Sequence, residues 1–107
     1  MRRKRPDPPP DTAFLASLVL LRNDPELVGE ILPLADAGNR HAMYALGLIY
    51  AEGRGVAPDP VQAYIWLTRA IELGDAEAHL LRDMLMNGMS EQDIAMADKT
   101  LSALSVQ

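Results

Sequence analysis

Few side chains in this sequence could carry out catalysis or bind a metal. The only histidines are His41 and His79, and the absence of cysteine excludes disulfides, zinc–thiolate sites and a cysteine nucleophile. A zinc site needs three or four converging ligands, which is more than these two histidines supply. We therefore predict no metal site and no cofactor.

The remaining candidates for chemistry lack the necessary neighbours. Serine occurs at positions 17, 90, 102 and 105, and none has a histidine close by in sequence or the glycine pattern of a nucleophile elbow. The Gly53-Arg54-Gly55 segment lacks the lysine and the spacing of a phosphate-binding loop. We predict that the protein is not an enzyme and has no small-molecule substrate, which leaves a binding function.

Capping residues divide the chain into the elements that must position any binding site. Asp24-Pro25 and Asp59-Pro60 each place an N-cap oxygen before a proline at the first helical position. Gly38-Asn39 and Gly74-Asp75 each end one helix and begin the next. No segment alternates with period two, so no strand is expected. The predicted helices span residues 12–22, 25–37, 40–52, 60–73, 76–87 and 91–104.

The same pattern of helix-ending and helix-capping residues recurs along the chain. Gly38 and Ala42 recur 36 residues later as Gly74 and Ala78. A period in the thirties with two helices per unit is typical of a helical solenoid, in which each unit buries its apolar face against its neighbours. We predict an all-α fold, a short right-handed α-solenoid of antiparallel helix pairs with about six helices.

One unit of this repeat, residues 39–74, resembles the Sel-one-like repeat, a bacterial-type relative of the tetratricopeptide repeat with a longer loop between its helices. Twelve positions carry the resemblance and are expected to be structural: Ala42, Leu46, Gly47, Tyr50, Gly53, Gly55, Val56, Asp59, Ala63, Trp66, Ala70 and Gly74. Their spacing supports this independently, because Ala42, Leu46, Ile49 and Tyr50 fall on one stripe of a helix. We expect Trp66 to be a buried core residue.

A second stripe on helix 40–52 is left over for function. In the family that the resemblance implies, the first helices of successive units line a concave groove that holds a partner protein or peptide. The period continues this stripe onto helix 76–87. The predicted protein-binding residues are His41, Tyr44, Leu48, Glu52, Glu77, Leu80, Met84 and Asn87. Truncation of Tyr44 or Leu48 is expected to open no cavity in the main core. The alternative is that the N-terminal helices or the closing helix fold over the stripe.

The N-terminus differs from the rest of the chain in charge. Residues 1–12 carry four basic and two acidic side chains, and since the whole chain has a net charge of −5, the remainder holds −7. An acidic body disfavours nucleic-acid binding, which needs a basic patch. With Pro8, Pro9 and Pro10, the basic residues predict a flexible arm over residues 1–11 ahead of one helical-repeat domain over residues 12–107.

The apolar run Ala13–Leu21 has the length of the hydrophobic region of a signal peptide. Asp7, the prolines and Asp11 separate it from the basic residues, and no small-residue cleavage site follows. The run is also shorter than the ~20 residues that span a bilayer. We therefore expect a core helix and a cytoplasmic protein.

The leading function is thus a non-catalytic adaptor, scaffold or regulator that binds another protein. Two alternatives remain. The first is a self-assembling homodimer, with Leu101 and Leu104 or Phe14 and Leu18 pairing between chains. The second is a nucleic-acid or membrane tether that acts through the basic arm, and the acidic charge of the rest of the chain makes this one less favoured.

Overall fold

The computed structural model describes residues 11, 15, 19, 22 and 24–105. Over these residues the chain is all-helical, with five helices and no strand. The helices are α2 (Leu27–Asp36), α3 (Arg40–Glu52), α4 (Pro60–Glu72), α5 (Ala76–Met86) and α6 (Glu91–Ser105). The predicted helix 12–22 lies mostly outside the described residues, as does the predicted arm.

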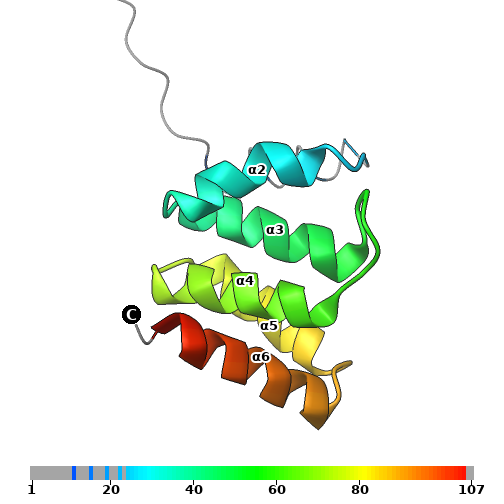
Figure 1. Cartoon of the computed structure of the whole chain (residues 1–107), viewed down its shortest axis with the longest axis vertical. Coiled ribbons are helices and arrows are strands. Elements are labelled where there is room, and N and C mark those ends of the chain that lie inside the picture. Colours follow the sequence, from blue (N-terminus) through cyan, green and yellow to red (C-terminus); the bar gives the residue numbers. More distant parts are fainter. Residues whose placement is uncertain (1–10, 12–14, 16–18, 20–21, 23, 106–107) are drawn as a thin grey trace, which may run out of the picture.

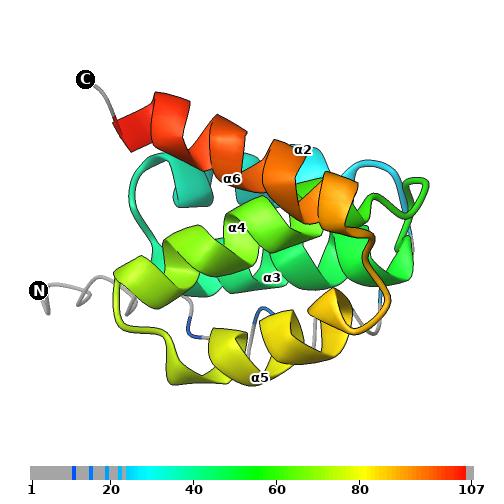
Figure 2. The ribbon, with the colours of Figure 1, turned by 90° about the horizontal axis from the view of Figure 1, so that it is seen from below.

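Neighbouring helices alternate in direction (Figure 1). Down the long axis of the molecule, α2, α3, α4 and α6 follow one another, and α5 lies behind α4. Viewed from below, α5 and α6 lie on opposite sides of α4 (Figure 2). The most extensive packing joins α3 to α4, and α4 also packs on both α5 and α6. None of the helices in the described part of the chain is long and apolar enough to cross a membrane.

Three of the predicted N-caps are confirmed. The side chain of Asn39 accepts hydrogen bonds from the first turn of α3, that of Asp59 from α4 and that of Asp75 from α5. The prediction for Asp24-Pro25 was wrong in detail, since α2 begins later, at Leu27. Asp24 instead accepts a hydrogen bond from the backbone N–H of Glu26 in the turn before the helix.

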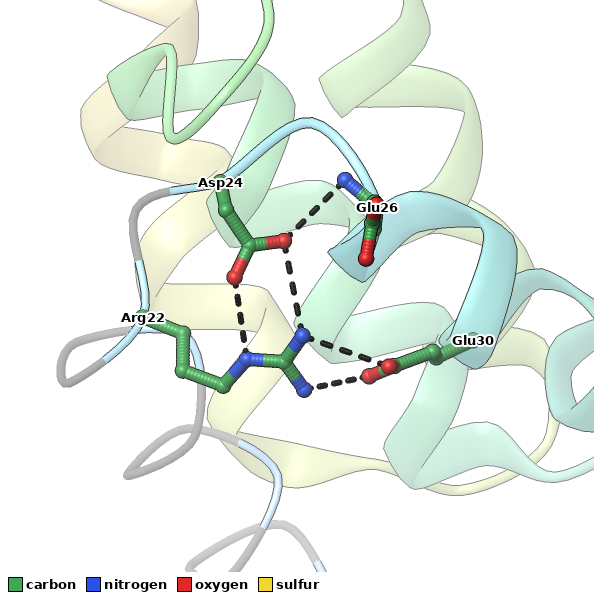
Figure 3. A network of polar contacts seen from close by, with 4 residues as sticks. All are labelled: Arg22, Asp24, Glu26 and Glu30. Atoms are coloured by element: carbon green, nitrogen blue, oxygen red, sulfur yellow. Dashed lines mark hydrogen bonds and ion pairs between the residues drawn. The ribbon is translucent and has the colours of Figure 1, made fainter.

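The segment that leads into α2 is held by an ion-pair network that the sequence analysis missed (Figure 3). Arg22 donates through Nε to Oδ2 of Asp24 at 3.0 Å and pairs with both carboxylate oxygens of Glu30 on α2. These hydrogen bonds, Glu30 first and Asp24 second, raise the pKa of Arg22 above its ordinary value. The network ties Arg22, which lies before α2 in the chain, to the helix itself.

The largest buried cluster spans α2, α3 and α4, reaches α5 through Ala78, and includes Leu15 and Val19 from the segment before α2. Trp66 belongs to it and is 8% exposed, so its predicted burial is confirmed. A second, smaller cluster joins α4 to α6 around Ile65 and Ala97. Tyr64 is a member of this cluster, and its hydroxyl donates to Asp98 on α6 at 2.9 Å. The main cluster therefore joins α2 to α5, and α6 is added to it through α4.

Gly47 allows α3 and α4 to approach closely. A Cβ at this position would lie 2.5 Å from Cδ2 of Leu67, which is itself fully buried. Real Cβ atoms do not tolerate such a contact, so any larger residue would push the two helices apart. The structure thereby supports the structural role predicted for Gly47.

We expect Asn39→Ala to lower the free energy of unfolding by about 1 kcal/mol and the melting temperature by roughly 4–8 °C. The reason is that Asn39 Oδ1 accepts from the backbone N–H groups of both His41, at 2.9 Å, and Ala42, at 3.2 Å. Thermal unfolding followed by circular dichroism measures the effect. Gln62→Ala, at an exposed position of α4, is the control and should change little. Equal melting of both variants would contradict the capping role.

Candidate functional site

The side chains of α3 and α5 enclose a surface hollow of about 320 Å³. Its lining consists of Tyr44 from α3 and four residues of α5, namely Glu77, Leu80, Leu81 and Met84. Four of these five were predicted: Tyr44 from the second stripe of α3, and Glu77, Leu80 and Met84 from the 36-residue period that carries this stripe onto α5. Leu81 was missed, because it lies beside the projected positions rather than on one of them.

The α5 side of this hollow is open to solvent. Leu80 is 68% exposed and Met84 is 62% exposed, and only Ala78 of α5 is fully buried. Large apolar side chains left this exposed and adjacent to one another are typical of surfaces that meet another molecule. The hollow is thus an apolar surface on the side of α5 that faces α3.

Tyr44 forms the α3 wall and is half-buried. Burial is the main cause that raises the pKa of its hydroxyl, and the negative charges of Glu77, Asp75 and Glu52 raise it further. The hydroxyl therefore stays protonated at neutral pH and can donate a hydrogen bond from the wall of an apolar hollow. It also lies in the field of acidic groups.

The expectation that Leu48 lies outside the core was wrong. Leu48 is 8% exposed and belongs to the same buried cluster as Leu15 and Val19. The helical stripe placed Leu48 on a face that α4 does not cover, but residues before α2 contribute to this cluster as well. Truncation of Leu48 would open a core cavity, so a Leu48 variant could not report on binding alone.

The other predicted site residues do not line the hollow. His41 places Nδ1 4.0 Å from Oδ2 of Asp75, the residue that caps α5. Glu52 accepts a hydrogen bond from Nε of Arg54 at 2.8 Å. Asn87 is exposed at the C-terminal end of α5. These three residues were predicted to share one binding site with Tyr44 and Met84, but none of them lines the hollow.

Comparison with known families identifies the part of the chain that contains α3 and Tyr44. Residues 40–75 match the family model described as the Sel1 repeat. The chain contains a Sel1 repeat. This confirms the resemblance of residues 39–74, and Sel1 repeats generally mediate protein–protein interaction. No curated protein and no solved structure matches the chain significantly.

The Sel1 repeat comprises α3, the loop after it, α4 and the Asp75 cap. The hollow therefore lies between the first helix of the repeat and α5, the helix that follows it. A second and smaller hollow, of about 180 Å³, lies where the repeat ends and includes His79 and Gly74. Within the described residues, no three His, Asp or Glu side chains converge in a group that could hold a metal ion.

Proposed function

We propose that this chain is a non-catalytic adaptor that binds a segment of another protein in the hollow between α3 and α5. The observation that carries the proposal is the apolar surface formed by Tyr44, Leu80, Leu81 and Met84, left open beside a Sel1 repeat. A half-buried tyrosine with large apolar neighbours is the kind of surface on which interface energy is concentrated.

We also propose that α2 to α6 are part of a short right-handed α-solenoid within one domain over residues 12–107. The alternating direction of the helices and the capping glycines at a 36-residue spacing support this arrangement (Figure 1). In such a solenoid α3 and α5 are the first helices of successive units, and the hollow lies on the concave side.

Self-assembly through α6 is the second candidate. Met96 and Leu104 of α6 are 57% and 47% exposed, which favours a further contact surface at this end of the molecule. Leu101, predicted to pair between chains, packs against the α4–α6 cluster instead. Phe14 and Leu18, the other predicted pairing residues, lie outside the described residues.

Two matched double variants separate these candidates. The partner is captured from the native cell with the full chain, and its affinity is then measured by calorimetry. Leu80→Ser with Met84→Ser should weaken binding by about 30-fold or more, since loss of a strong interface anchor costs about 2 kcal/mol. Both side chains are exposed, so the fold should be retained.

Met96→Ser with Leu104→Ser removes similarly exposed apolar side chains from α6 and should leave this affinity unchanged. The opposite pattern would move the binding surface to α6. Light scattering of both double variants and of the unmodified chain tests self-assembly in the same samples.

A further inference from the structure

The charge around the hollow is one-sided. Of the five residues that line it, Glu77 alone is charged, and it is exposed in the first turn of α5. Asp75 lies directly before α5, and the Tyr44 hydroxyl senses both carboxylates together with that of Glu52. A ligand that enters the hollow therefore meets negative charge beside the N-terminus of α5.

The arginines of α3, α4, α5 and the loops between them interact with groups outside the hollow. Arg40 donates to the Leu73 carbonyl at 3.1 Å, and Arg54 donates to Glu52. Arg69 stacks over the Trp66 ring. Arg82 donates to Thr68 on α4 and lies over the Tyr64 ring. None of these four lines the hollow, so within the described residues no lysine or arginine lies beside Glu77 to offset its charge.

The size of the hollow limits what can occupy it. A volume of about 320 Å³ is at the lower end of the roughly 300–1,000 Å³ found for small-molecule sites. Its α5 side is open, as the exposure of Leu80 and Met84 demonstrates. A single bulky side chain projecting from a longer peptide fits such a shallow apolar surface, and Glu77 in the first turn of α5 is the charged group that a neighbouring side chain of the peptide would meet.

We propose that the partner segment is a cationic amphipathic peptide, with one bulky apolar side chain in the hollow and a lysine or arginine beside Glu77. This inference rests on the proposed function and adds the chemistry of the partner. Complementary charge at the rim would act on specificity and association rate, while the apolar contact would supply most of the affinity.

A pair of fluorescein-labelled synthetic peptides tests the inference. Both have leucine at the same helical positions, and their polar positions are all lysine in one peptide and all glutamate in the other. Fluorescence anisotropy with the full chain should give a dissociation constant on the order of tenfold lower for the lysine peptide, and the preference should shrink at high salt. Glu77→Lys should abolish or reverse the preference.

Asp36→Lys is the matched control for charge. It changes the net charge by the same amount at an exposed position of α2, a helix that does not line the hollow, and it should retain the preference. The double variant Leu80→Ser with Met84→Ser should lose the lysine peptide. Equal loss of preference in the Glu77 and Asp36 variants would mean general attraction to an acidic protein and would overturn the inference.

The remaining outcomes separate this inference from the proposed function. If the two peptides bound with equal affinity and both lost binding in the Leu80 and Met84 variant, the charge preference would be wrong while the binding role of the hollow would stand. If the lysine peptide still bound to the Leu80 and Met84 variant, both the binding role of the hollow and its preference for a cationic peptide would be contradicted. If the lysine peptide bound only to a chain lacking residues 1–10, the occupant of the hollow would be the chain's own basic terminus and not a partner. If the peptide bound neither the full chain nor the shortened one, a cationic partner would be rejected.

Discussion

Replacement of Trp66 with alanine is expected to lower the free energy of unfolding by about 3–5 kcal/mol, the range found for deletion of a large buried aromatic side chain. Trp66 is 8% exposed and belongs to the main buried cluster, which also holds residues of α2 and α3. The Arg69 guanidinium lies 4.7 Å from the centre of the indole ring, and this cation–π contact is lost as well.

Small domains are stable by only about 5–15 kcal/mol, so this variant should be partly unfolded under mild conditions. Urea unfolding followed by circular dichroism at the helix band measures the change without depending on tryptophan fluorescence. Leu73→Ala, at an apolar position that is 47% exposed at the end of α4, is the matched control. A Trp66 variant as stable as the Leu73 variant would place the indole outside the core.

The features of this fold that could be predicted from sequence are the local and repetitive ones. The caps at Asn39, Asp59 and Asp75 depend on a side chain two or three residues from the N–H groups that it accepts from, and local spacing contains that information. Trp66 could be assigned to the core because it occupies a position that the resemblance to the Sel-one-like repeat gives as structural, and because Ala63, Trp66 and Ala70 fall on one apolar stripe of their helix.

The features that were missed depend on contacts between distant segments. Leu48 is buried in a cluster that includes Leu15 and Val19, and no helical period reports which segment covers a given face. Arg22 lies eight residues from Glu30, with a turn between them, so no helical spacing relates the two. Three of the five residues of the hollow were found because the repeat period relates α3 to α5, and Tyr44 was found because it lies on the second stripe of α3. Leu81 was missed because its place depends on how the two helices rotate relative to each other.

Gly55→Ala is expected to destabilise the protein by about 2–5 kcal/mol, because two effects add. Gly55 has φ of +77°, where an L side chain costs about 1–2 kcal/mol. A Cβ added at this position would also lie 2.2 Å from the carbonyl oxygen of Asp24, a backbone atom just before α2. Movement of the α3–α4 loop away from that atom adds roughly 1–3 kcal/mol of overpacking.

Gly38→Ala separates the two effects. Gly38 has a comparable φ of +94°, but a Cβ there would meet nothing within 4 Å. This variant should therefore incur the conformational cost alone, and the difference in urea midpoint between the two variants measures the contact of the loop with Asp24. If both variants lost the same stability, the loop of the Sel1 repeat would not dock on the segment before α2. The segment before α2 would then be joined to the repeat only through the packing of α2 on α3.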